Sequence, residues 1–298
     1  MPRWPPAWCS PKSRASEGGN LRSRVGAAVL PPAAAVLAPL PTAFAQWPGF
    51  DLQAHSGGRG ETTGGKPSSE FPRAEMVWGN KIATLPDVFA LTDSYRADVR
   101  YNIETKVQAD HPGASAGPQE FVDVVLAAVR SAGKVDRVEI QSFDWRTLPM
   151  VHQAEPSILL VALWNEQTWV PDSPWLAGIN PAVVGDPMIG AMLVGASILS
   201  PRYALVAGNA FVDRAHLLGL KVIPWTVNDA DAMWEQIAYG VDGVITGYPA
   251  LLRDVLAIPL SDVAIARGYS TDSGWLRGAF SAEIQSGAHV EAEPACKG

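Results

Sequence analysis

Cysteine is almost absent from this chain: only Cys9 and Cys296 occur among its 298 residues, one near each end. Two such cysteines form no disulfide framework and have no metal-ligand spacing. Basic residues are also outnumbered, because 23 Lys and Arg face 30 Asp and Glu and give a net charge of −7. This balance provides no basic patch for nucleic acid. The chain further lacks a G-x-S-x-G elbow, a phosphate-binding P-loop, an H-E-x-x-H motif and an EF-hand loop.

What the chain has is an ordinary globular composition, with 47% apolar and 18% charged residues. Its length suits one large α/β domain or two small ones, and a single barrel of about 250 residues fits within it.

The first 45 residues predict a signal segment. Two arginines precede an apolar, alanine-rich run at 25–40, and an A-x-A cleavage pattern ends at Ala45. The run is too short and too rich in proline to span a membrane as a stable helix. We therefore expect an exported protein, periplasmic or secreted, that begins near Gln46. A disordered Pro/Ala tail is the alternative.

Strands and helices alternate between residues 46 and 258, which predicts βαβ units around a parallel sheet. The predicted strands are 50–54, 99–107, 137–143, 157–164, 196–200, 220–227 and 241–246. The predicted helices are 85–94, 118–132, 147–154, 207–218, 229–239 and 250–256. We expect long loops at 56–70 and from 164 to 192, the latter with at most a short helix, and an irregular tail at 259–298.

The fold class predicted is α/β, a TIM-type (β/α) barrel. A complete barrel has eight strands. Only about seven are recognisable here, so the barrel is expected to be incomplete. An open doubly wound sheet is the alternative, although no glycine-rich fingerprint opens a helix after the first strand.

Polar residues alternate along the strand 99–107, where Arg100, Asn102, Glu104 and Lys106 fall on one face. If both faces of the strand are covered, this polar face points into the barrel. Buried charges are costly unless they are paired or bind a ligand, which favours a site at this strand. An amphipathic strand with one solvated face is the alternative.

Two further strand ends carry candidate residues. His55 follows the strand 50–54, in the position of a general acid–base group. Trp225, in the segment PWTVND, could stack on a glycerol or choline-like group. A structural histidine and ordinary packing of the tryptophan are the alternatives.

The order of several short motifs resembles the glycerophosphodiester phosphodiesterase family, especially its exported bacterial members. The motifs are QAH followed by GGRG, IATLPDVFAL, YNIETK, IQSFDWRTL, KVIPWTVND and GVDGVITGYP. The resemblance implies a barrel enzyme that hydrolyses glycerophosphodiesters to glycerol 3-phosphate and an alcohol, with a pair of histidines and a divalent cation, Ca²⁺ or Mg²⁺. By this resemblance, His55 is the first catalytic histidine, Glu104 a metal ligand and Lys106 a phosphate contact.

The sequence also departs from the family pattern. Ser56 stands where the family has a phosphate-binding arginine, and the resemblance offers Arg59 as a nearby substitute. Glu61 is the expected remnant of a metal-binding glutamate. The block that should follow, with a strand bearing E-x-D and the second histidine, is absent, and the closing T-D-Y-P reads T-G-Y-P at residues 246–249.

These departures leave three hypotheses. The first is a phosphodiesterase of the family with reduced activity. The second is a catalytically impaired or truncated member. The third is a hydrolase of another class, such as one acting on carboxylic esters, although the absence of a nucleophile elbow disfavours a serine mechanism.

Overall fold

The computed structural model describes residues 49–58, 60–63, 71–72, 74–77, 79 and 83–258. All of them belong to one compact unit, Pro41–Gly298. The predicted signal segment 1–45 and tail 259–298 lie outside the described residues and remain predictions. None of the described helices is long and apolar enough to cross a membrane.

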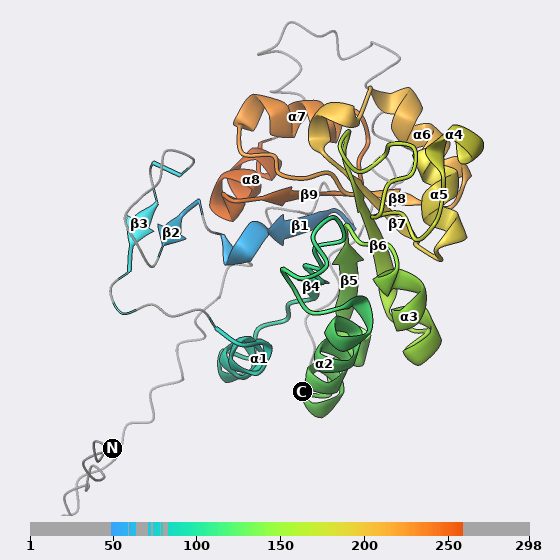
Figure 1. Cartoon of the computed structure of the whole chain (residues 1–298). Helices are drawn as coiled ribbons and strands as arrows, with labels where there is room; N and C mark the ends of the chain where they lie inside the picture. Colours follow the sequence, from blue (N-terminus) through green and yellow to red (C-terminus); the bar gives the residue numbers. More distant parts are fainter. Residues whose placement is uncertain are drawn as a thin grey trace, which may run out of the picture. The chain divides into compact units, whose positions relative to one another are not determined.

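Seven parallel strands form the centre of the described unit (Figure 1). They are β1 (Asp51–Ala54), β4 (Tyr101–Glu104), β5 (Val138–Ser142), β6 (Leu159–Trp164), β7 (Ile198–Pro201), β8 (Lys221–Val222) and β9 (Gly243–Thr246). Strands β4 to β8 form one sheet in chain order, and β1 pairs with β9.

Backbone hydrogen bonds connect these two sheets. The amide of Asp242 donates to the carbonyl of Val222 at 2.9 Å, and the amide of Ile245 donates to that of Pro224 at 3.0 Å. The strands therefore follow one another as in a TIM barrel, from β4 round to β9 and then β1. Within the described residues no ladder joins β1 to β4. The prediction of an incomplete barrel of about seven strands is confirmed.

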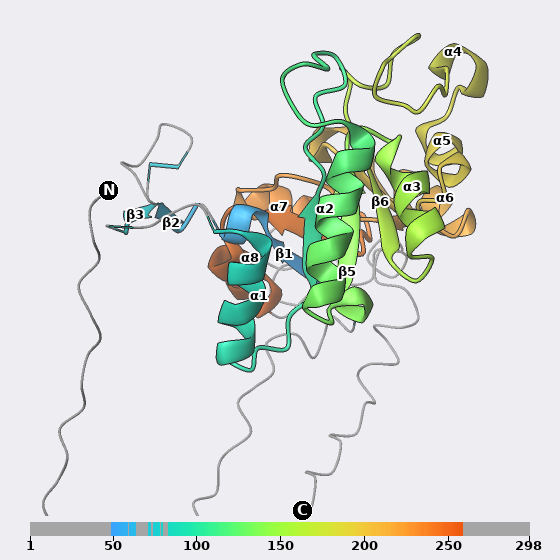
Figure 2. The ribbon, with the colours of Figure 1, turned by 60° about the horizontal axis from the view of Figure 1, so that its bottom comes forward.

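Eight α-helices lie between or after these strands in the described part of the chain. They are α1 (Leu85–Ser94), α2 (Pro118–Ser131), α3 (Thr147–Ala154), α4 (Pro181–Val184), α5 (Pro187–Leu193), α6 (Asn209–Leu217), α7 (Ala230–Ala238) and α8 (Pro249–Leu256). Helices α1 and α3 have the predicted bounds, and Figure 2 shows α1 beside α2. Helix α1 begins at a capping box, in which Thr84 and Asp87 bond each other's backbone amides.

The segment 164–192 corrects a prediction, because it holds two short helices rather than at most one. Each begins with a capping side chain followed by proline: Asn180 accepts from the amide of Ala182, and Asp186 from that of Met188. Helices of four and seven residues are too short to leave a clear 3.6-residue pattern.

Other strand predictions were too long or incomplete. The strand expected at 220–227 is a two-residue strand followed by a single bridge between Trp225 and Arg202. Pro224 lies between them and has no amide to donate, which interrupts the ladder. The loop expected at 56–70 contains a short strand, β2 (Thr62–Thr63), which pairs in parallel with β3 (Glu75–Met76) beyond the end of that loop.

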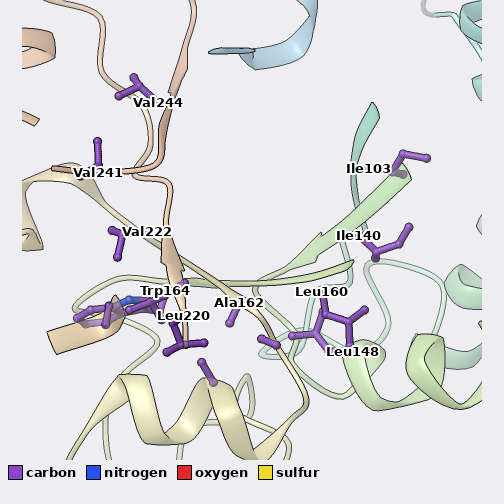
Figure 3. Close-up of a cluster of buried hydrophobic side chains, with 14 of the residues drawn as sticks. Ile103, Ile140, Leu148, Leu160, Ala162, Trp164, Leu220, Val222, Val241 and Val244 are labelled. Atoms are coloured by element: carbon purple, nitrogen blue, oxygen red, sulfur yellow. The ribbon is translucent and has the colours of Figure 1, made fainter. Parts of the chain in front are cut away.

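The main core lies between the strands and the helices that cover them. Figure 3 shows Ile140, Leu160 and Ala162 from the strands and Leu148 from α3, all at most 1% exposed. The opposite strand faces contribute a second, smaller cluster of Val161, Ile198, Ile223 and Ile245. Because side chains alternate along a strand, this second cluster is the interior of the partial barrel.

Candidate active site

His55 lies at the carboxyl end of β1. It begins a single 3₁₀ turn, His55–Gly57, in which the chain reverses through three left-handed residues: Ser56 at φ 49°, Gly57 at 70° and Gly58 at 86°. The amide of Gly58 closes the turn on the His55 carbonyl at 3.0 Å. The two glycines adopt this conformation without steric cost, whereas Ser56 is strained there. The turn leaves the histidine half-buried at the edge where strand-end residues of barrels meet.

Glu104 and Lys106 lie at the carboxyl end of β4. Tyr101 and Ile103 on the opposite face are 8% exposed, so the predicted alternation of this strand is correct. The strand ends at Glu104, however, and Lys106 lies beyond it. The Lys106 ammonium contacts the Glu104 carboxylate at 2.5 Å, with side-chain exposures of 68% and 16%. Solvent therefore reaches the lysine more readily than the glutamate.

Glu61 and Arg59 follow the His55 turn. The carboxylate of Glu61 accepts from the amide of Ala250 at 2.6 Å, in the first turn of α8. Beside it, the amide of Gly60 donates to the carbonyl of Gly247 at 2.7 Å. The predicted metal ligand thus caps a helix in this structure. Arg59 lies outside the described residues, and its assignment remains a prediction.

Trp225 lies at the same carboxyl edge, half-buried among aromatic rings. Its indole nitrogen donates to the carbonyl of Ser200 at 2.8 Å. Phe143 meets its ring edge-on at 5.3 Å between centroids and also contacts Trp175 at 6.4 Å. Neither Phe143 nor Trp175 is among the predicted site residues. Two sequence features point to them: Phe143 is an aromatic residue directly after a strand, and Trp175 lies in the tryptophan-rich segment that follows β6.

The sequence predicts the polar face that carries Asn102, but not the polar network that Asn102 joins inside the barrel. The side-chain amide of Gln53 donates to Glu139 at 2.7 Å and accepts from Asn102 at 2.6 Å, and Asn102 also donates to Gln141 at 3.1 Å. Alternation could have found this set, because Glu139 and Gln141 fall on the strand face opposite Val138 and Ile140.

Glu139 is a buried carboxyl group, only 4% exposed. Burial raises the pKa of Glu139 to about 7, and the nearby Asp51 carboxylate adds to the increase. The hydrogen bond from Gln53 and the positive charges of Arg100 and Lys221 oppose it. The interior of the barrel therefore holds a carboxyl group that titrates near neutral pH.

The carboxylates of the described residues, as arranged, do not fit a divalent cation. Ca²⁺ requires six to eight oxygen ligands and Mg²⁺ an octahedron. The described residues contain no group of three or more His, Cys, Asp or Glu side chains able to hold a metal ion. The two predicted ligands are also engaged elsewhere, Glu61 with the Ala250 amide and Glu104 with Lys106.

The decisive comparison is with protein families. The sequence profile of the "Glycerophosphoryl diester phosphodiesterase family" matches residues 51–251, which is about two thirds of the chain. The chain belongs to this family. The matched range includes His55, Arg59, Glu61, Glu104, Lys106 and Trp225, so every predicted site residue lies within the family domain.

Two curated relatives agree with this assignment. A glycerophosphodiester phosphodiesterase of Bacillus subtilis (strain 168) is 32% identical over 181 residues, which cover 59% of this chain and 55% of the relative. A glycerophosphodiester phosphodiesterase from Caldanaerobacter subterraneus subsp. tengcongensis is 27% identical over 183 residues, which cover 61% of this chain and 65% of the relative. The chain thus spans less than two thirds of the length of each of these family members.

A solved structure supports the family fold. It is the crystal structure of a protein described as a glycerophosphoryl diester phosphodiesterase from Silicibacter pomeroyi DSS-3. It is 26% identical, with a TM-score of 0.52, over 67% of this chain and 62% of that one.

Proposed function

We propose that this protein hydrolyses glycerophosphodiesters to glycerol 3-phosphate and an alcohol. One observation carries the proposal: within the family domain, His55 at the end of β1 and the Glu104–Lys106 pair at the end of β4 lie on the carboxyl edge of parallel strands. Barrel enzymes assemble their active sites at this edge.

The chemistry requires one proton donor or acceptor and one positive charge. A water oxygen attacks phosphorus, the bond from phosphorus to the alcohol oxygen breaks, and the alcohol leaves with a proton. An imidazole such as that of His55 can transfer this proton near neutral pH. Lys106, 68% exposed, offers its ammonium to the phosphate oxygens while Glu104 holds it from the other side.

We expect this hydrolysis to be slow. Ser56 provides no positive charge directly after His55, and no second histidine accompanies His55 in the motifs of the chain. Loss of one of two acid–base groups costs on the order of 10²–10⁴ in rate. A catalytically impaired protein is the second candidate, favoured by the same two features.

Dependence on Ca²⁺ or Mg²⁺ belongs to the proposal only as an implication of the family resemblance. In a phosphodiesterase, such an ion would polarise the phosphoryl group. Because the described carboxylates do not fit a cation as arranged, we assign no step to a metal in this protein.

The test is release of glycerol 3-phosphate from glycerophosphocholine by the purified protein, with and without added calcium or magnesium. We expect His55→Ala to lower kcat/KM by about 10²-fold or more, because the proton transfer is lost. His152→Ala, which changes an exposed histidine of α3, is the matched control and should retain full activity. If the wild-type protein releases no more product than His55→Ala, the proposed activity is wrong.

We further propose that the protein is exported to the periplasm or beyond, because residues 1–45 have the pattern of a signal segment. N-terminal sequencing of the protein from a periplasmic or culture fraction should then begin at Gln46. Recovery of the uncleaved chain from the cytoplasm alone would contradict export.

A further inference from the structure

The site residues belong to two strands that share no backbone hydrogen bonds within the described part of the chain. His55 ends β1, which pairs only with β9, and Glu104 ends β4, which pairs only with β5. A shared substrate phosphate would have to contact both strand ends. Some contact other than a β-ladder must therefore hold β1 in place relative to β4.

The side chain of Gln53 makes this contact. Its nitrogen donates to Glu139 of β5 at 2.7 Å, and to Asp51 of its own strand at 2.9 Å. Its oxygen accepts from Asn102 of β4 at 2.6 Å. The two donor hydrogens of the amide are thus used, and so is its acceptor oxygen. The side chain of Gln53 therefore connects β1 to both β4 and β5, with which β1 forms no ladder in the described residues.

Each of the two residues in this contact lies on the same strand as a predicted site residue and close to it in sequence. Gln53 precedes His55 by two residues, and Asn102 precedes Glu104 by two residues on the same face of β4. The side-chain amide of Asn102 in turn donates to the side-chain oxygen of Gln141 of β5 at 3.1 Å. Gln141 lies opposite Glu104 in the register of β4 and β5. A shift of Gln53 relative to Asn102 would therefore change the separation of His55 and Glu104.

We propose that Gln53 is a positioning residue of the active site, which replaces a strand-to-strand ladder and fixes His55 relative to Glu104 and Lys106. This inference rests on the proposed phosphodiesterase function. Reactions of this kind are sensitive to position, and a displacement of about 1 Å can cost on the order of 10²-fold in rate.

The charged groups around Gln53 predict how the activity of a Gln53 variant should depend on pH. Asp51 of β1 and Glu139 of β5 are negative when ionised, and Arg100 before β4 and Lys221 of β8 are the nearby positive groups. In Gln53→Glu, a third carboxyl group would face Asp51 and Glu139, and none of the three could donate a hydrogen bond once all are ionised. Protonation at acidic pH would restore one donor. The activity of Gln53→Glu relative to wild type should therefore increase as the pH falls.

The experiment compares Gln53→Ala, Gln53→Glu and Gln119→Ala with wild type. Gln119 is the matched control, because its side chain makes a single exposed hydrogen bond, to Asp123 on α2. Below its unfolding temperature, Gln53→Ala should lose at least tenfold in kcat/KM for glycerophosphocholine, with the loss mainly in kcat. Gln53→Glu should show the pH dependence described above, and Gln119→Ala should match wild type. A folded Gln53→Ala with wild-type kcat, or a Gln53→Glu ratio that does not change with pH, would overturn the proposal.

Amide hydrogen exchange provides a readout that does not need activity. Gln53→Ala should accelerate exchange in residues 51–55 and 101–104, and Gln119→Ala should not, because only the first variant removes the contact between β1 and β4. Unchanged exchange would refute the positioning role even in an active enzyme. An inactive wild-type protein would refute the proposed function, and accelerated exchange in Gln53→Ala would then still support the contact.

Discussion

At the scale of single residues, Glu139 is a carboxyl group buried inside the barrel. It is 4% exposed, receives a hydrogen bond from Gln53, and lies near Asp51, another carboxylate. Burial and like charge both disfavour ionisation, so the pKa of Glu139 in the folded protein rises to about 7 from an ordinary value of 4.5. The protonation of this residue is therefore coupled to folding.

The stability of the protein should decrease as the pH rises through this range. Below pH 4.5 the carboxyl group is protonated in both the folded and the unfolded chain, and its contribution to stability is greatest. As the pH rises toward 7, the unfolded chain releases its proton first, and the free energy of unfolding falls by an amount on the order of 3 kcal/mol. Glu139→Gln removes the charge and keeps an oxygen that can accept from Gln53. We expect this variant to be more stable than wild type above pH 7.

Chemical denaturation of wild type and Glu139→Gln at several pH values measures this difference. The difference in free energy of unfolding between the two proteins should increase from pH 4.5 to pH 7 and then stay constant. Glu155→Gln, at a partly exposed glutamate that pairs with Arg130, is a control that keeps the buried carboxylate. If the free energies of unfolding of wild type and Glu139→Gln differ by the same amount at all pH values, the pKa of Glu139 is not raised by folding.

At the scale of secondary-structure elements, the loop after His55 is attached to the start of α8. Glu61 caps the helix through the amide of Ala250 at 2.6 Å, and Tyr248, the residue before the helix, provides no side-chain cap. A carboxylate in this place also interacts favourably with the helix dipole. Gly60 fits closely beside it, because a Cβ there would lie 2.5 Å from the carbonyl oxygen of Gly247.

Capping and metal binding by Glu61 predict different results for two variants. If Glu61 caps α8, Glu61→Ala should lower the free energy of unfolding by about 1 kcal/mol, and Glu61→Gln should lose less, because its amide oxygen still accepts from Ala250. Both effects should be the same with calcium or with a chelator. If Glu61 binds a metal, both variants should instead lose any stabilisation by calcium. Thermal unfolding of the three proteins in each buffer separates the two roles.

At the scale of the whole molecule, seven parallel strands form the centre of the described residues, and no ladder among these residues closes the gap between β1 and β4. Unpaired strand edges leave amide and carbonyl groups that must find other partners. Gln53 and Asn102 connect the strands across the gap through their side chains, but they do not form a ladder.

Calcium provides a test at this scale. A cation that binds only the folded protein must raise its unfolding temperature. Since the described carboxylates are engaged by Ala250 and Lys106, we expect millimolar calcium or magnesium to change the unfolding temperature of the wild-type protein by no more than sodium at equal ionic strength. A clear increase with either ion, abolished in Glu104→Gln, would show that the carboxylates rearrange into the metal site that the family resemblance predicts.

The sequence by itself determined the local elements and the family. Helices α1 and α3 were predicted to the residue, because periodicity and the start signals near Thr84 act within a few positions along the chain. The strand carrying Glu104 was recognised from alternation, and the side to which Tyr101 and Ile103 point followed from it. Short helices such as α4 escaped prediction, because four residues contain little more than one helical turn.

Only the tertiary structure decided which distant groups meet. Gln53 and Glu139 are 86 positions apart, and Glu61 and Ala250 are 189 positions apart. These contacts depend on the order of strands around the barrel and on the gap between β1 and β4, which no local pattern of residues encodes. The motifs of the sequence therefore indicate candidate residues such as His55 and Glu104, but the partners of these residues follow only from the tertiary structure.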